Sequence, residues 1–218
     1  MRTLTRREFL AMGACASQSL PLSRMYAFTI KPRVKFKIGV TDWSLKLAGK
    51  LEVIALAKSL GFDGVQVSIG KGTDSLQRAD SALQKAYLDE SKRVGLPVES
   101  LCLEVLHRNF LKSDPLGARW VADSVGIAKA MNVRVVLLPF FNKGTLTNME
   151  EMNKVGDILK EIAPSAEKAG VILGLEDTIS ARDNVRIMER TKSSAVLTYY
   201  DVGNSTGNGF NVIEEIRC

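Results

Sequence analysis

The chain repeats one unit, in which a short apolar segment is followed by an amphipathic helical segment. Residues 35–41 have the composition of a β-strand, residues 50–60 carry apolar side chains at helical spacing, and Gly61 ends the helix. Further strands are expected at residues 64–69, 98–106, 133–139, 171–176 and 195–200. Because a strand–helix–strand repeat places its strands parallel, this alternation predicts an α/β fold with one parallel sheet covered by helices.

The helical segments between these strands carry their own start and stop signals. Asp114 and Pro115 form a cap followed by a first-turn proline, while Gly95 and Gly170 follow the ends of two other helical segments. Helices are therefore expected at residues 50–60, 75–94, 114–131, 149–169, 181–190 and 211–217.

Two architectures share this alternation, an eight-fold β/α barrel and an open doubly wound sheet. The segment Gly70-Lys-Gly72 lacks the GxGxxG spacing and does not lead straight into a helix, which argues against a dinucleotide-binding fold. Barrel enzymes carry their chemistry at the carboxyl ends of the strands, so polar residues at those ends favour the barrel. Such residues follow most of the expected strands: Thr41-Asp42-Trp43, Ser68, Glu104, Glu176 and Asp201.

Glu176 and Asp201 end successive strands. The carboxyl ends of parallel strands meet at one rim, so the two carboxylates would face a shared mouth where a divalent cation could bridge them. The alternative is that each acid caps the helix that follows its strand. Asp177 is expected to be a loop or cap residue, and it would replace Glu176 as a ligand only if the strand register slips by one.

Three segments resemble the sugar phosphate isomerase/epimerase family, the xylose isomerase-like TIM barrels: Ile38-Gly-Val-Thr-Asp-Trp43, Ala169-Gly-Val-Ile-Leu-Gly-Leu-Glu-Asp177 and Tyr199-Tyr-Asp-Val-Gly-Asn204. The resemblance covers residues 36–218. It implies that Glu176 and Asp201 bind a divalent metal ion, Mn²⁺ or Mg²⁺ before Zn²⁺ or Co²⁺. It also implies a small sugar or sugar derivative as substrate and Glu176 as the catalytic base that moves a proton beside a carbonyl, through an enediolate.

Four other residues are candidate substrate contacts. Asn204 lies three residues after Asp201, where members of this family often have a His or Asn that contacts substrate, or it shapes the turn at residues 203–206. His107, the only histidine, and Glu104 lie near the end of the third expected strand. Trp43 would offer a flat apolar wall to a sugar ring, and a structural role is the alternative.

Residues 36–218 supply six of the eight strand–helix units of a full barrel, which takes about 250 residues. By the resemblance, the third and fourth metal ligands, a histidine and a glutamate, belong to strands seven and eight. We therefore expect either a fragment of an isomerase or epimerase, or a non-catalytic carbohydrate-binding or remnant barrel. Open edges on the first and sixth strands would also suit a homo-oligomer.

The positive charge is concentrated at the start of the chain. Of a net charge of +6, residues 1–35 hold seven basic residues against one acid, and the remainder is neutral, which argues against a nucleic-acid partner. Thr5-Arg-Arg-Glu-Phe-Leu10 resembles a twin-arginine export signal, which predicts a periplasmic or cell-surface location. Met12-Gly-Ala-Cys15 loosely resembles a lipoprotein box, so a lipid anchor at Cys15 is an alternative to simple cleavage. No segment has the roughly 20 apolar residues of a transmembrane helix.

Overall fold

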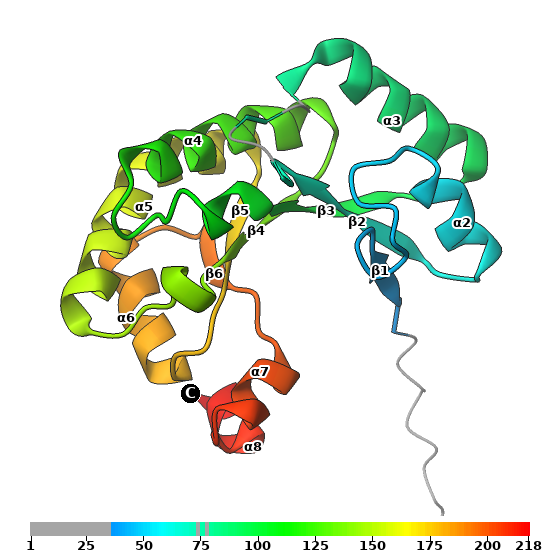
Figure 1. Cartoon of the computed structure of the whole chain (residues 1–218). Coiled ribbons are helices and arrows are strands. Elements are labelled where there is room, and N and C mark those ends of the chain that lie inside the picture. The colour runs from blue at the N-terminus through cyan, green and yellow to red at the C-terminus, as the bar shows by residue number, and fades with distance from the viewer. Residues whose placement is uncertain (1–35, 73–74, 77–78) are drawn as a thin grey trace, which may run out of the picture. The chain divides into compact units, whose positions relative to one another are not determined.

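The computed structural model of the 218-residue chain describes residues 36–72, 75–76 and 79–218 (Figure 1). The chain divides into two units, Met1–Phe36 and Lys37–Cys218. The expected export signal and the expected anchor at Cys15 lie outside the described residues. Every described helix and strand belongs to the second unit.

Six parallel strands form one sheet in the order of the sequence, with each strand hydrogen-bonded to the next. A doubly wound sheet reverses its strand order at a switch point, whereas consecutive order is what the wall of a β/α barrel requires. The predicted parallel α/β fold is confirmed. The strands are β1 (Gly39–Thr41), β2 (Gly64–Ile69), β3 (Val98–Leu103), β4 (Val135–Pro139), β5 (Ile172–Glu176) and β6 (Val196–Thr198).

Long helices alternate with the strands and cover one face of the sheet (Figure 1). They are α2 (Val53–Ser59), α3 (Ser81–Val94), α4 (Pro115–Ala130), α5 (Met149–Ala169) and α6 (Ala181–Thr191). Two short helices follow β6, and two 3₁₀ turns follow β3 and β4. These are α7 (Val202–Gly207), α8 (Val212–Arg217), η3 (Glu104–His107) and η4 (Asn142–Gly144). In the described part of the chain, no helix has the length and apolar character needed to cross a membrane.

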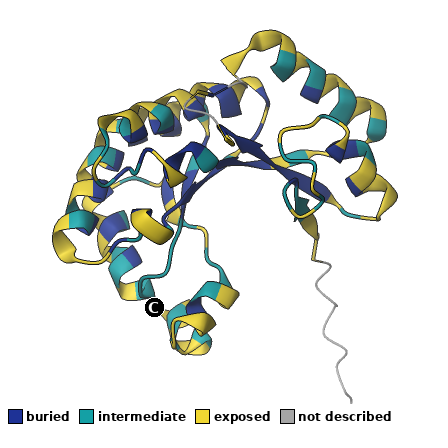
Figure 2. Cartoon of the chain, in the orientation of Figure 1, coloured by how far each residue is buried: buried dark blue, intermediate teal, exposed yellow. Residues whose placement is uncertain are grey.

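The period of two along each strand separates an apolar face from a polar one. On β2, Val65 and Val67 join the core cluster, whereas Gln66 and Ser68 are buried polar residues outside that cluster. The core therefore lies between the sheet and its helices (Figure 2). The opposite face, called the inner face below, is left to carry polar side chains.

Local signals fix most helix boundaries. Asp114 accepts a hydrogen bond from the backbone N–H of Leu116 at 2.9 Å, which caps α4 as its sequence predicts. Some expected bounds differ from the structure. Helix α3 begins at Ser81, capped by Asp80, and not at residue 75. The expected turn at residues 203–206 lies inside helix α7.

Candidate functional site

A cavity of about 370 Å³ opens at the carboxyl ends of the strands. We call it the rim cavity. All six residues singled out from the sequence line it, although they come from four separate places in the chain. The lining residues are Trp43, Cys102, Glu104, His107, Pro139, Phe141, Glu176, Asp201 and Asn204.

Glu176 is the last residue of β5 and Asp201 follows β6, so two neighbouring strands bring their carboxylates to one cavity. Burial, followed by the negative charges of Asp201 and Asp177, raises the pKa of Glu176 to about 7. The cavity thus concentrates negative charge on the β5–β6 side.

Asp201 also fulfils the alternative considered from the sequence, because it caps a helix. Its Oδ1 accepts hydrogen bonds from the backbone N–H groups of Gly203 at 2.6 Å and Asn204 at 2.9 Å. The cap fixes the orientation of the carboxylate at the rim and places Asn204 in the first turn of α7. Capping and a role in the cavity are therefore compatible for this residue.

Asp177 does not line the rim cavity. Its Oδ1 accepts hydrogen bonds from the backbone N–H of Ile179 at 3.1 Å and from Nδ2 of Asn184 at 3.0 Å. Burial raises the pKa of Asp177 to about 6, and its buried Oδ2 has no hydrogen-bond partner among the described residues. Asp177 is thus a residue of the loop after β5, in agreement with its expected role.

Glu104 and His107 reach the cavity from a 3₁₀ turn, since β3 ends at Leu103 and not at the expected residue 106. The Oε1 atom of Glu104 lies 3.5 Å from Nζ of Lys71. Burial lowers the pKa of His107 below its usual value, so its imidazole is neutral at pH 7. The β3 side of the cavity therefore offers a paired carboxylate and a neutral imidazole.

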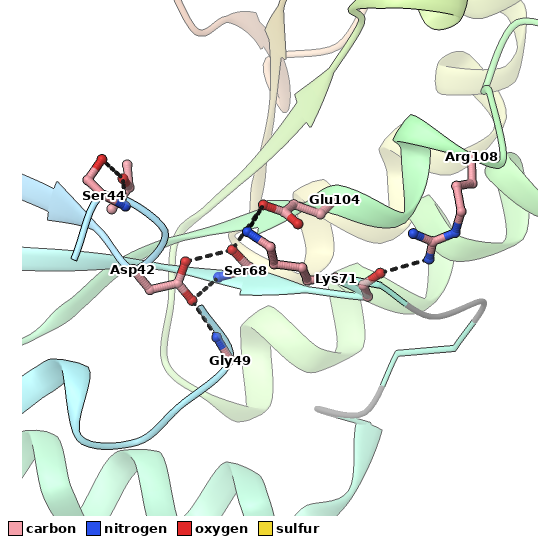
Figure 3. Close-up of polar contacts among 9 residues, drawn as sticks. Asp42, Ser44, Gly49, Ser68, Lys71, Glu104 and Arg108 are labelled. Carbon is pink, nitrogen blue, oxygen red and sulfur yellow. Dashed lines mark hydrogen bonds and ion pairs between the residues drawn. The ribbon is translucent and has the colours of Figure 1, made fainter. Parts of the chain in front are cut away.

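Asp42 is the organising residue that sequence reasoning missed. It is fully buried, and it accepts hydrogen bonds from the backbone N–H of Ser68 at 2.9 Å, the hydroxyl of Ser68 at 2.6 Å and the backbone N–H of Gly49 at 3.0 Å (Figure 3). These bonds tie the loop after β1, which carries Trp43, to β2. The only sequence signal was an acid at the end of the first strand.

Comparison with known proteins identifies the family. Residues 54–217, more than half of the chain, match the family described as Xylose isomerase-like TIM barrel. The chain belongs to the xylose isomerase-like TIM barrel family. The expected family is confirmed, and the six parallel strands are a large part of such a barrel.

Curated relatives of this xylose isomerase-like chain include the L-ribulose-5-phosphate 3-epimerases UlaE of Escherichia coli O1:K1 / APEC and of Escherichia fergusonii. Each is 31% identical over 139 residues, which cover 58% of this chain and 47% of the relative. The chain therefore spans about half the length of the curated relatives it matches.

Solved structures of similar fold include 3-keto-D-glucoside 4-epimerase YcjR from E. coli, with a TM-score of 0.65 and 16% identity over 84% of this chain and 74% of that chain. An L-ribulose 3-epimerase gives a TM-score of 0.64 and 20% identity, and the match covers 84% of this chain and 66% of that chain. At this identity the likeness shows the fold alone.

The xylose isomerase-like fold implies a metal ion, and the donor chemistry of the rim cavity can be compared with that requirement. Glu176 and Asp201 are carboxylates, which suit Mg²⁺ or Mn²⁺, and a cation between them would offset their mutual repulsion. Within the described residues, however, no group of three or more His, Cys, Asp or Glu side chains is arranged to hold an ion. The pair fits two ligands of a divalent cation.

Proposed function

We propose that the chain belongs to a metal-dependent sugar isomerase or epimerase and carries a residue that transfers the substrate proton. The observation that supports this proposal is the convergence of Glu176, Asp201, His107 and Asn204 on the rim cavity. The cavity volume of about 370 Å³ lies within the range of about 300–1,000 Å³ found for small-molecule sites.

Glu176 is the proposed catalytic base. Its carboxylate would take a proton from the substrate carbon next to a carbonyl, which leaves an enediolate. Return of the proton to the adjacent carbon gives isomerisation, whereas epimerisation needs a second group that delivers a proton to the opposite face of the same carbon. Glu176 is well placed for this role because it ends a strand whose backbone is fixed by pairing with β4 and β6. A carboxylate on a rigid strand keeps its orientation through both proton transfers.

The other lining residues would bind and orient the sugar. The neutral imidazole of His107 and the amide of Asn204 can each exchange hydrogen bonds with sugar hydroxyls. Trp43 offers an apolar ring face to the C–H side of a sugar, and Glu104 can accept a hydroxyl proton.

Glu176 and Asp201 would hold a divalent cation, Mn²⁺ or Mg²⁺ before Zn²⁺ or Co²⁺. A bound cation would offset the negative charge that develops on the substrate oxygens when the proton is removed. The relatives named as L-ribulose-5-phosphate 3-epimerases support a ketose or ketose phosphate as the substrate class for this chain.

Two measurements test the proposal. Mn²⁺ should raise the melting temperature of the wild-type chain by several degrees when it is present far above its Kd, and Glu176→Gln should lose most of this shift. Glu161→Gln, at an exposed position on α5, is the matched control and should keep it. Absence of a shift in the wild type, or an equal shift in Glu176→Gln, would contradict the metal pair.

The second measurement follows deuterium incorporation from D₂O into L-ribulose and D-fructose by NMR. The wild type should exchange the proton beside the carbonyl, and Glu176→Gln should reduce the rate by at least about 100-fold, as expected when a general base is removed. Sugar binding without exchange would favour the alternative, a non-catalytic carbohydrate-binding domain.

A further inference from the structure

A second cavity lies on the inner face, nearer the amino ends of the strands. Its volume is about 430 Å³, and its lining includes Thr41, Gln66, Ser100 and Tyr199. On β3, Ser100 lines this lower cavity, whereas Cys102, two residues further along the strand, lines the rim cavity. Since residues two apart on a strand share a face, the two cavities are stacked along the inner face.

Tyr199 follows β6 and connects this end of the sheet to β2 and β3. Its hydroxyl accepts a hydrogen bond from Nε2 of Gln66 at 3.4 Å and is also hydrogen-bonded by the side chain of Ser100. Gln66 and Ser100 are 4% and 3% exposed, and Nε2 of Gln66 donates to Oγ of Ser100 at 2.8 Å. The chain just after β6 is thereby attached to β2 and β3, by a Tyr199 side chain that is 38% exposed and bonds to the buried Gln66 and Ser100.

The ring of Tyr199 packs on β5 directly below the proposed base. A Cβ atom placed on Gly174 would lie 3.1 Å from Cβ and 3.2 Å from Cδ2 of Tyr199, so the absence of a side chain at Gly174 makes room for the ring. Gly174 and Glu176 are two apart on β5, so they share the inner face. The ring therefore occupies the space beneath Glu176.

Strand β6, like β1, is a short strand at an edge of the described sheet. It has three residues, and within the described sheet it pairs only with β5. The backbone N–H of Tyr199 still donates to the carbonyl of Leu175 at 2.7 Å, but Asp201 lies beyond this bond. The hydrogen bonds of the Tyr199 hydroxyl to β2 and β3 therefore restrain the segment that carries Asp201.

We propose that Tyr199 is a positioning residue for the carboxylate pair and the floor of the rim cavity. Its ring supports the space beneath Glu176, and its hydroxyl holds the end of β6, with Asp201, against β2 and β3. The expected effect of Tyr199 on turnover rests on the proposed function of the rim cavity. Its expected effect on the backbone after β6 does not.

The test compares Tyr199→Phe with Tyr200→Phe in the intact chain. Tyr200 is the matched control, because its hydroxyl donates to Oγ of Ser205 at 2.9 Å, within the same segment of chain. Tyr199→Phe should speed amide hydrogen exchange of residues 199–204 by at least about tenfold, because the hydrogen bonds of the hydroxyl to Gln66 and Ser100 are lost, with β4 and β5 unchanged. Tyr200→Phe should leave residues 199–201 at the wild-type rate.

Kinetics supply the second readout, with L-ribulose and D-fructose as probes. Tyr199→Phe should lower kcat for deuterium exchange by about tenfold and leave KM within about twofold, because substrate contacts lie above the floor. Gly174→Ala, which crowds the ring and keeps the hydroxyl, should give the same pattern.

Wild-type amide exchange in Tyr199→Phe, or an equal change in Tyr200→Phe, would overturn the inference. A wild-type chain that exchanges no ketose proton would contradict the proposed function, and amide exchange would still decide the role of Tyr199.

Discussion

Replacing Asp42 with alanine should strongly destabilise the fold, although Asp42 lies at the end of a three-residue edge strand. Its Oδ2 accepts from the backbone N–H groups of Ser68 and Gly49, and its Oδ1 accepts from the hydroxyl of Ser68. Alanine leaves these donors without their acceptor in a site where Asp42 and Ser68 are 0% exposed. The loop that carries Trp43 would lose its attachment to β2.

The magnitude follows from the number of donors left unpaired. The hydroxyl of Ser68 can turn toward Oε1 of Glu104, which already lies 3.4 Å away, so its loss is partly offset. The backbone N–H of Ser68 has no such alternative, whereas Gly49 is exposed and its N–H can bond to water. One buried unpaired donor costs about 1–3 kcal/mol, which is the expected cost of Asp42→Ala.

Urea unfolding of the intact chain at pH 7, followed by circular dichroism, measures this free energy. The matched control is Asp89→Ala, which removes a carboxylate that is 61% exposed and pairs with Lys85 one helical turn away. That change should cost less than about 0.5 kcal/mol. A cost of less than about 1 kcal/mol for Asp42→Ala would refute the assignment of the loop's stability to this carboxylate.

Three further substitutions test other parts of the structure. Gly117→Ala should destabilise the chain by about 1–3 kcal/mol in urea unfolding, because its Cβ would lie 2.7 Å from the carbonyl oxygen of Asn109, which is backbone and cannot move aside cheaply. Glu99→Gln should stabilise the chain at pH 7 more than at pH 4, as thermal melting at the two values would show. Burial and a nearby carboxylate raise the folded-state pKa of Glu99 above 4.5, so the wild type loses stability as pH rises from about 4.5 through that higher value. Lys112→Met should cost about 1–3 kcal/mol, since the Lys112 side chain is 14% exposed and its ammonium group bonds to the carboxylate of Glu151 at 2.9 Å. An unchanged urea midpoint would contradict this.

Local sequence signals predicted much of the fold because helix caps and apolar periodicity depend on neighbouring residues. The expected helix at 149–169 has the bounds of α5, and Asn148 caps it through a hydrogen bond from the N–H of Glu151 at 2.9 Å. The expected turn at residues 203–206 was wrong because its glycine and polar residues favour turns, whereas the carboxylate of Asp201 supplies a cap that allows α7 to form.

The candidate site was predicted in part for the same reason. Glu176 and Asp201 follow apolar strands directly, so the parallel topology alone places them at one rim. His107 and Glu104 reach the cavity differently, from a 3₁₀ turn. The apolar run at residues 98–106 predicted a strand there, because it continues past the point where β3 ends. Their roles, like those of the acid pair, stay predictions for the experiments above.

The sequence by itself determined the parallel strands, the polar rim and the pair of acids, because each follows from local patterns of apolar and polar residues. Only the tertiary structure decided what holds that rim in place. Asp42 bonds to Ser68, 26 residues away, and Tyr199 to Gln66, 133 residues away. Such pairs leave no local pattern, since the hydrogen bonds form only after the sheet has brought distant strands together.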